Sequence, residues 1–366
     1  MAENFKPTDI YAYLSQKVLG QDDVLRPISV AVYKHINGIS GGNILLIGNS
    51  GTGKTTIMKS IRQFYHDHAH LDRYRSMVVM NANTLVDEEG EVNTNRIFKN
   101  LEADVHNLLG PELNADTLRR YMEHATVCFD EVDKVSSRIS GKVNVTGILI
   151  QQALLTILEG ETVQYETVIY EGETSRRVKF PLDTSKFLFV CGGAFEELYD
   201  QVYTLVEEQK DERRLKQSNL WDDEAGRMRK IIDFKLKNYL KLSDMFTYGM
   251  VPQFISRFSA IGILDDLSRD VLREIMLTAA DSPLLHSRRF FESFDIELRL
   301  TGEALDKIAT YAADNSRIGA RALREVFTRI VARFEFDPFS SDLLREENGR
   351  KVLEIDRDTV MANISY

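Results

Sequence analysis

The sequence predicts an α/β protein built around a parallel central sheet, and two segments carry that prediction. The first is a short apolar run over residues 44–47, which leads directly into a glycine-rich turn. The second is the run Thr126–Phe129, which favours a strand and is followed by Asp130 and Glu131. Strands that alternate with helical segments along a chain pair in parallel through right-handed crossovers. The expected fold class is therefore α/β.

The glycine-rich turn has the composition of a phosphate-binding loop. Residues 48–55 read Gly-Asn-Ser-Gly-Thr-Gly-Lys-Thr, and the glycines let backbone N–H groups point inward at a phosphate. The helix expected from Lys54 onward adds the positive end of its dipole. Lys54 would reach the β- and γ-phosphates, and the Thr55 hydroxyl would hold Mg²⁺. An idle glycine-rich turn is the alternative, and the preceding strand argues against it.

The two carboxylates after the second strand complete the expected site. Asp130 would hold Mg²⁺ through water, and Glu131 would orient and polarise the attacking water. The alternative is a buried strand that ends in a solvated acidic turn, which the position after a phosphate loop disfavours. ATP and Mg²⁺ are thus the expected cofactors. The expected nucleotide-binding residues of these two segments are Asn49, Ser50, Gly51, Thr52, Gly53, Lys54, Thr55, Thr56 and Asp130, with Thr55 and Asp130 on the metal.

Composition and charge exclude several classes of protein. The chain has 366 residues, of which 43% are hydrophobic and 28% charged, so it has room for two domains. The formal net charge of −10 argues against nucleic acid as the main ligand, because phosphate backbones need clustered Lys and Arg. No apolar run is long enough to span a bilayer, and the first residues lack the apolar core of a signal peptide. Cys128 and Cys191 lie in apolar runs, as expected for buried thiols of a cytoplasmic protein.

Two arginines and a group of histidines have alternative interpretations. Arg257 follows an apolar stretch, and Arg321 lies in the first turn of an amphipathic helix. By spacing alone each is a surface arginine in a salt bridge, whereas an arginine that meets a γ-phosphate would neutralise transition-state charge. His66, His68 and His70 suggest either a metal site or a solvated helix end, and the second interpretation is the better one.

A series of short motifs runs along the chain in a fixed order. They are Val18–Gln21, Ala31–His35, Asn43–Thr55, Phe129–Lys134, Gln151–Leu155, Leu158–Gly160, Asp183–Lys186, Cys191–Phe195, Tyr248–Arg257 and Gly319–Arg321. In these motifs the chain resembles the ClpX (Clp/HslU-type) family of hexameric AAA+ protein unfoldases over nearly all of its length. The resemblance implies an AAA+ P-loop domain over residues 1–262. It also implies a small, mostly helical α+β lid domain over residues 265–366.

The same resemblance assigns roles to individual residues. Val18 and Leu19 would line the adenine pocket. Arg257 would be the arginine finger that reaches the nucleotide of a neighbouring subunit, and Arg321 would be the sensor on the small domain. With Glu131, these arginines make up the expected catalytic set. A finger that acts in trans implies a homo-oligomeric ring, expected to be a hexamer. The region near Cys191 would hold the family's first sensor, but no polar candidate is evident there.

Periodicity places elements in the second domain. Helices are expected near Leu267–Ala280, Glu303–Ala313 and Ala320–Phe334. Short strands are expected at Ile296–Leu300 and Lys351–Ile355. The order of these elements is that of the family's small domain.

The chain departs from the family where the family handles protein. No zinc-binding domain is expected ahead of residue 1, and an acidic stretch at 90–93 stands in place of the aromatic pore-loop motif. The peptidase-docking loop has no counterpart in the charged segment 196–247. That segment is expected to be a helical insert, with one apolar face around Leu198 and another over Ile232, Leu236, Tyr239 and Leu240. A hairpin over 162–180 replaces the basic entry loop.

These observations predict an ATP-hydrolysing ring ATPase that remodels or disassembles a specific protein partner without a ClpP-type peptidase. The partner is unidentified, and neither a membrane nor nucleic acid is expected as one. One alternative is a threading unfoldase with an atypical pore loop. Another is a nucleotide switch or scaffold, in which ATP orders a ring and slow turnover resets it.

Overall fold

The computed structural model describes residues 5–139, 141–171, 174–208, 217–222, 227–232, 234–315 and 319–364. The chain divides into two compact units. The large unit comprises Met1–Ser15, Asp23–Gly48 and Thr55–Ile263, and the small unit comprises Gln16–Asp22, Asn49–Lys54 and Leu264–Tyr366. The glycine-rich loop therefore belongs to the small unit, although the residues before and after it in the sequence belong to the large unit.

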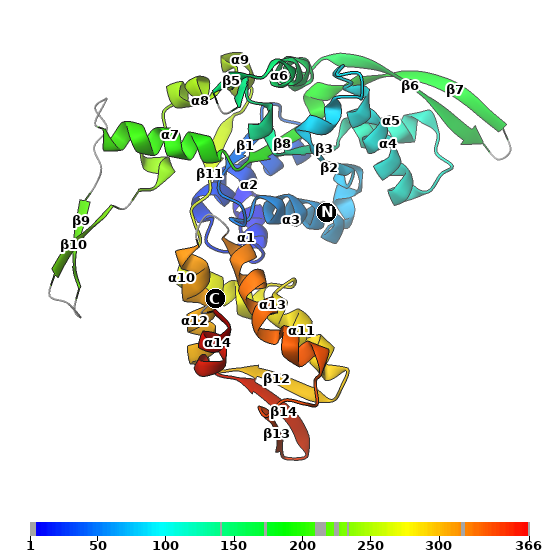
Figure 1. The fold of residues 1–366 in the computed structure, drawn as a ribbon. Coiled ribbons are helices and arrows are strands. Elements are labelled where there is room, and N and C mark those ends of the chain that lie inside the picture. The colour runs from blue at the N-terminus through cyan, green and yellow to red at the C-terminus, as the bar shows by residue number, and fades with distance from the viewer. Residues whose placement is uncertain are drawn as a thin grey trace. The chain divides into compact units, whose positions relative to one another are not determined.

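A five-stranded parallel sheet forms the centre of the large unit (Figure 1). Its strands lie in the order β11-β1-β8-β3-β2, and every pairing is parallel. The strands are β1 Ile44–Ile47, β2 Met77–Asn81, β3 Thr126–Asp130, β8 Leu188–Gly193 and β11 Ala260–Ile263. All four side chains of β1 are buried, as expected for a strand covered on both faces. The predicted α/β fold with a parallel central sheet is confirmed.

Helices cover this sheet because their apolar residues recur at helical spacing. In α4, Ile97, Phe98, Leu101 and Val105 are buried in one core with Phe129 of β3. Two of these helices begin at asparagine caps, since Asn114 accepts the Thr117 N–H and Asn144 accepts the Gly147 N–H. The helices are α1 Pro7–Ser15, α2 Asp22–Ile36, α3 Lys54–Asp67, α4 Asn95–Leu109, α5 Ala115–Glu123, α6 Val145–Leu158, α7 Glu196–Glu207, α8 Leu242–Tyr248 and α9 Pro252–Ile255. Short 3₁₀ turns lie at Ala69–Tyr74, Ala82–Leu85, Val132–Val135, Thr184–Lys186 and Leu236–Asn238.

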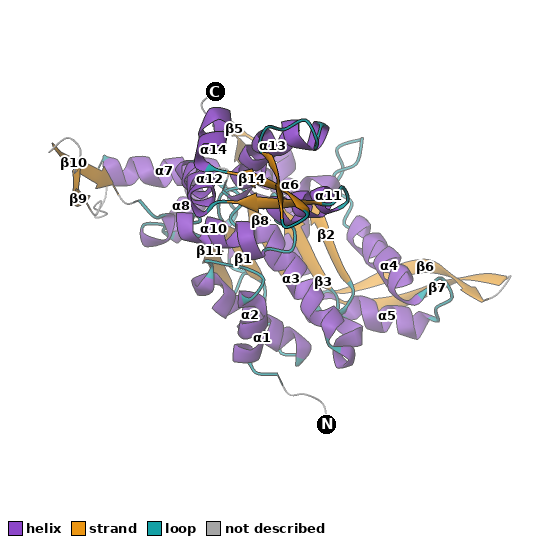
Figure 2. Ribbon diagram, turned by 90° about the horizontal axis from the view of Figure 1, so that it is seen from below, coloured by secondary structure: helices purple, strands orange, loops and turns teal. Residues whose placement is uncertain are grey.

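In its described residues the large unit also carries three antiparallel hairpins of named strands. They are β4 Arg138–Ile139 with β5 Lys142–Val143, β6 Thr162–Glu171 with β7 Thr174–Asp183, and β9 Gln217–Asp222 with β10 Arg227–Ile232. The β6–β7 hairpin confirms the one predicted over 162–180, and it lies beside α4 and α5 (Figures 1 and 2). Its base is attached to α4, since the Glu102 carboxylate accepts the Tyr165 hydroxyl at 2.5 Å and also the Thr167 hydroxyl.

The segment 196–247 is helical only in part. Its first predicted face is confirmed, because Leu198, Val202 and Val206 are buried on α7. The second predicted helical face is wrong: Ile232 ends strand β10, and Leu236 lies in a short 3₁₀ turn. The β10 backbone pairs with β9 instead. Local spacing of apolar residues does not reveal such a pairing, because the partner strand supplies the hydrogen bonds.

Among its described residues, the small unit contains five helices and a three-stranded sheet, which share one hydrophobic core (Figure 1). The helices are α10 Arg269–Thr278, α11 Pro283–Glu292, α12 Gly302–Asp314, α13 Ala320–Phe336 and α14 Arg357–Ile364, and the strands are β12 Ile296–Leu300, β13 Leu344–Glu347 and β14 Arg350–Ile355. The predicted elements correspond to α10, α12, α13, β12 and β14. Sequence reasoning missed α11, α14 and β13. The Val326, Ile330 and Phe334 side chains of α13 are buried at the spacing of one helix face.

Candidate active site

The chain between β1 and α3 forms a glycine-rich loop that folds back on itself. Gly51 and Gly53 have φ angles of +76° and +112°, in a region that glycine adopts without strain. The carbonyl of Asn49 accepts the Thr52 hydroxyl at 2.8 Å and the Lys54 ammonium at 2.9 Å. The loop is thus closed on itself, and Lys54 lies against its first carbonyl. This is a conformation suited to wrapping backbone N–H groups around a phosphate.

A buried glutamine holds the loop on one side. The Gln21 side chain is 3% exposed and donates to the carbonyls of Thr52 at 3.0 Å and Asp265 at 2.8 Å. Its oxygen accepts the Asp265 N–H at 3.1 Å. Sequence reasoning missed Gln21 as a site residue, although it is the last residue of the motif Val18–Gln21. In the same motif Val18 is buried and Leu19 half-buried, and a Cβ on Gly53 would lie 3.8 Å from the Val18 side chain.

The N-terminus of helix α13 meets the same loop. The Ala320 N–H donates to the Gly51 carbonyl at 3.2 Å. Gly319 approaches so closely that a Cβ there would lie 2.8 Å from the Ser50 carbonyl oxygen. The exposed Arg321 follows in the first turn of α13. The N-terminus of α13 thus lies against the glycine-rich loop, and its Ala320 N–H is paired with a loop carbonyl.

In the large unit, the predicted acidic residues lie where strand β3 ends. Because β1, β3 and β8 are parallel, their carboxyl ends share one edge of the sheet. Asp130 accepts the Glu131 N–H at 2.9 Å, and Glu131 is exposed with a φ of +56°. A non-glycine residue at this φ carries backbone strain, which proteins tend to store at functional sites. Thr55 and Thr56 are exposed in the first turn of α3.

The buried Asp133 lies against the end of β8, close to the region near Cys191 where the sequence showed no polar candidate. Its side chain is 5% exposed and accepts the Ala194 N–H at 3.3 Å, just beyond the end of β8. A Cβ on Gly193 would lie 2.6 Å from its carboxylate. The motif Phe129–Lys134 contains Asp133, but only the fold brings it against β8.

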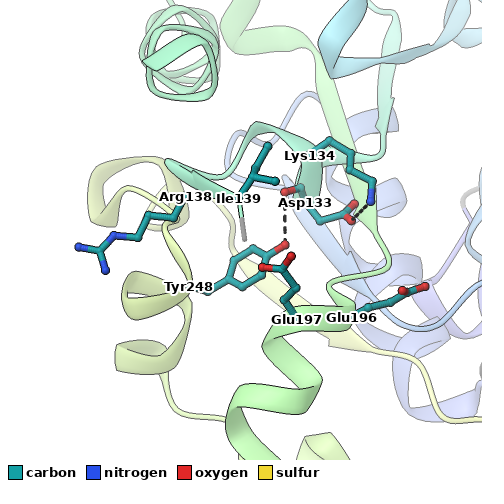
Figure 3. Close-up of a pocket in the computed structure, with 7 residues that line it drawn as sticks. All are labelled: Asp133, Lys134, Arg138, Ile139, Glu196, Glu197 and Tyr248. Carbon is teal, nitrogen blue, oxygen red and sulfur yellow. Dashed lines mark hydrogen bonds and ion pairs between the residues drawn. The ribbon is translucent and has the colours of Figure 1, made fainter. Parts of the chain in front are cut away.

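A small open pocket of about 110 Å³ lies beside Asp133 (Figure 3). The Tyr248 hydroxyl donates to the Asp133 carbonyl at 3.3 Å, and Glu197 lies next to the tyrosine (Figure 3). Burial raises the pKa of Tyr248, and the charges of Asp133, Glu197 and Glu196 raise it further. Pockets that bind drug-sized ligands are several times larger. This pocket is therefore too small for a nucleotide.

Arg257 lies just after α9, and its side chain pairs with a carboxylate of its own chain. The guanidinium contacts Glu159 at the end of α6. Both side chains are more than a third exposed, so the pair is accessible to solvent. The Arg257 carbonyl accepts the Asn43 amide at 3.3 Å, which ties its backbone to the start of β1.

Two of the three histidines near the end of α3, His68 and His70, belong to an aromatic cluster, and His66 is exposed. The His68 ring lies 4.7 Å from the Phe5 ring and 4.6 Å from the Phe64 ring, centroid to centroid. Within the described residues, no group of three or more His, Cys, Asp or Glu side chains is arranged to hold a metal ion. In the same part of the chain, no helix is both long and apolar enough to cross a membrane.

Comparison with known proteins places the chain in a family. The profile of the AAA domain (Cdc48 subfamily) matches residues 40–261. The chain belongs to this family of ATPases. The match includes β1, the glycine-rich loop and the acidic end of β3.

This AAA ATPase is also similar over most of its length to proteins described as ATP-dependent Clp protease ATP-binding subunit ClpX. The protein of Porphyromonas gingivalis is 28% identical over 342 residues, which is 89% of this chain and 76% of the relative. That of Bacteroides fragilis is 27% identical over 352 residues, or 92% and 78% of the two chains. That of Bacteroides thetaiotaomicron is 27% identical over 348 residues, or 91% and 77%. The chain is a ClpX-like AAA+ ATPase.

Proposed function

We propose that this ATPase uses hydrolysis to remodel or disassemble a particular protein partner, as a homo-oligomeric ring and without a partner peptidase. The observation that carries the hydrolytic part is the strained, exposed Glu131 directly after Asp130, at the sheet edge where β1 also ends. We also infer a reducing, cytoplasmic location, since Cys128 and Cys191 are buried free thiols.

Each of the proposed site residues would have a separate role in ATP hydrolysis. The backbone of residues 49–53 would bind the β-phosphate, Lys54 would neutralise the β- and γ-phosphates, and Val18 with Leu19 would contact the adenine. Thr55 and Asp130 would hold Mg²⁺, whose charge offsets that of the phosphates. Glu131 would orient the attacking water and polarise its O–H bond. The exposed threonine hydroxyl and the carboxylates are oxygen ligands of the kind Mg²⁺ prefers.

The two arginines would connect hydrolysis to assembly and to conformation. Arg257 is 40% exposed beside Glu159, and a neighbouring subunit's γ-phosphate would compete for its guanidinium. A finger supplied in trans makes each site incomplete without a neighbour, so a ring is required, and we propose a hexamer. Arg321, on the helix that begins against the phosphate loop, would couple nucleotide state to the small unit.

The acidic loop between β2 and α4 supports the hypothesis of a specific protein partner over that of general binding to any polypeptide. Val86 and Val92 pair as an antiparallel bridge, and Asp87 accepts the N–H groups of Glu89 at 3.0 Å and Glu91 at 2.9 Å. The side chains of Glu88, Glu89 and Glu91 are exposed, and no Phe, Tyr or Trp occurs from residue 81 to 96. Carboxylates remain hydrated and do not grip side chains by apolar contact as an aromatic ring does.

One observation supports the second candidate function, threading of a polypeptide. The β4–β5 hairpin and the start of α6 expose several apolar side chains. They are Ile139, Val143, Val145 and Leu149, of which Val143 is 73% exposed. Exposed apolar groups of this kind mark surfaces that contact other molecules. They would grip a polypeptide where the acidic loop does not.

The first test is ATP hydrolysis per subunit over a wide range of protein concentration. A ring with Arg257 acting across the interface gives a specific rate that rises with concentration and falls to the Lys54→Ala level in Glu131→Gln and Arg257→Ala. Glu131→Gln should still bind ATP, because the substitution removes only the group that polarises water. Hydrolysis no greater than that of Lys54→Ala under every assembly condition would refute the assignment.

Unfolding of a tagged, folded substrate separates the two candidate functions. The remodelling hypothesis predicts no general unfolding by the wild-type chain. The threading hypothesis predicts unfolding that increases in Glu91→Tyr, which restores an aromatic ring to the acidic loop, and decreases in Val143→Ser. The ATPase rate of each variant is the control for an intact nucleotide site.

A further inference from the structure

We propose that Asp266 is a positioning residue for nucleotide binding, which acts through Asn49 by holding the phosphate loop in its binding conformation. This inference rests on the proposed role of residues 49–54 as the phosphate site. Asp266 lies where the chain enters the small unit, and no motif in the sequence singles it out. Its contacts with the loop are the basis of the proposal.

The contact joins Asp266 to the residue on which the loop closes. The Asn49 side-chain amide donates to the Asp266 carboxylate at 2.8 Å, and Asn49 is 9% exposed. The carbonyl of the same asparagine accepts both the Thr52 hydroxyl and the Lys54 ammonium. A shift of Asn49 would therefore displace the acceptor shared by two other loop residues.

The neighbouring residue, Asp265, provides a second connection. Gln21 accepts the Asp265 N–H, donates to the Asp265 carbonyl, and donates its other N–H to the Thr52 carbonyl. The dipeptide 265–266 is thus linked to both ends of the loop, directly at Asn49 and through Gln21 at Thr52. Because Gln21 is buried with these hydrogen bonds made, the backbone next to Asp266 has a defined position.

Such links matter because the loop is rich in glycine. Glycine loses more conformational freedom on ordering than any other residue, so an untethered loop would have to be ordered by the nucleotide itself. Interactions that hold the loop before the ligand arrives remove part of that cost and raise affinity. The loop cradles phosphates that ATP and ADP share, so both nucleotides should gain to a similar extent.

The test is a double-mutant cycle on nucleotide affinity. A fluorescent ADP analogue and a non-hydrolysable ATP analogue are titrated against Asp266→Ala, Asn49→Ala and the double variant. One hydrogen bond of this kind predicts that each single variant binds about 2- to 10-fold more weakly. Because both variants break the same bond, the double variant should bind no more weakly than the weaker single variant.

Two further variants distinguish positioning from other effects. Asp266→Asn keeps an oxygen that accepts the Asn49 amide, and it should bind within about 2-fold of wild type. Asp270→Ala removes a nearby carboxylate that pairs with Arg269, and it should leave affinity unchanged. Thermal melting of each variant shows whether loss of the folded state accounts for any change.

Several results would overturn the proposal. The first is wild-type nucleotide affinity in Asp266→Ala. The second is an equal loss of nucleotide affinity in Asp266→Asn and Asp266→Ala. The third is a loss of affinity in the double variant equal to the sum of the two single losses in free energy. A lowered melting temperature with unchanged affinity would make Asp266 a structural residue only. Lys54→Ala separates this failure from that of the site itself, because nucleotide binding that survives the loss of Lys54 would refute the phosphate-loop assignment.

Discussion

Replacing Gly319 with alanine should detach the start of helix α13 from the glycine-rich loop. Gly319 has a φ of +55° and a ψ of −136°, outside the regions that residues with a Cβ adopt readily. The new Cβ would lie 2.8 Å from the Ser50 oxygen and 2.9 and 3.0 Å from the Gly51 carbonyl carbon and oxygen. These neighbours are backbone atoms of a closed loop, so they cannot move aside as a flexible side chain would.

The structure sets the size of the effect. An unfavourable φ/ψ combination costs about 1–3 kcal/mol. Retreat of the helix also lengthens the 3.2 Å hydrogen bond from the Ala320 N–H to the Gly51 carbonyl, which is worth about 0.5–1.5 kcal/mol. The two costs together lower the free energy of opening the first turn of α13 by about 1.5–4.5 kcal/mol, and about 2 kcal/mol corresponds to roughly a 30-fold change in that equilibrium.

Amide hydrogen exchange measures this local opening directly. Peptides that cover the first turns of α13 should exchange about 30-fold faster in Gly319→Ala. The same variant should bind nucleotide more weakly. Gly302→Ala is the matched control, because a Cβ at the start of α12 meets no atom within 4 Å. Equal exchange in the two variants would refute the reasoning, since it would mean that α13 does not contact the loop.

Three further predictions concern the large unit. Burial lowers the pKa of His35 to about 3. Its contribution to the free energy of unfolding is therefore complete above pH 6.5 and is lost as the pH falls towards 3. Urea unfolding should show about 1.4 kcal/mol less stability at pH 5.5 than at pH 7.5 from this group. Because Glu159 competes with a neighbouring subunit's γ-phosphate for Arg257, Glu159→Gln should raise the maximal ATPase rate about 2- to 5-fold with little change in KM. Glu102→Ala should speed amide exchange at the base of the β6–β7 hairpin about 30-fold, because it removes the acceptor of two hydroxyls.

For each of these three predictions, a control variant distinguishes the predicted effect from a general loss of structure. His35→Gln should abolish the pH-dependent difference, and an unchanged difference would assign it to another group. The effect of Glu159→Gln should vanish in an Arg257→Ala background; additivity would mean that Glu159 acts elsewhere. Glu102→Gln retains an acceptor and should exchange more slowly than Glu102→Ala, and equal rates would show that the hydroxyl contacts do not hold the hairpin.

Local patterns in the sequence predicted much of this protein. Strand β1 has the predicted bounds Ile44–Ile47, the β6–β7 hairpin is present, and α13 buries the predicted apolar face. Each of these depends on residues within a few positions of one another, where side-chain periodicity and turn chemistry decide the conformation. The β9–β10 hairpin was missed because a helical spacing of apolar residues does not exclude pairing with the preceding strand.

The sequence by itself determined strand β1, the glycine-rich loop and the acidic end of β3, because a few consecutive residues encode each of them. Only the tertiary structure decided what surrounds that loop. It placed Gln21 between Thr52 and Asp265, and Asp266 against Asn49. These contacts join residues 31 to 244 positions apart, and a chain acquires them only when its core has packed. No local pattern records them, since their energy depends on burial and distance and not on the identity of adjacent residues.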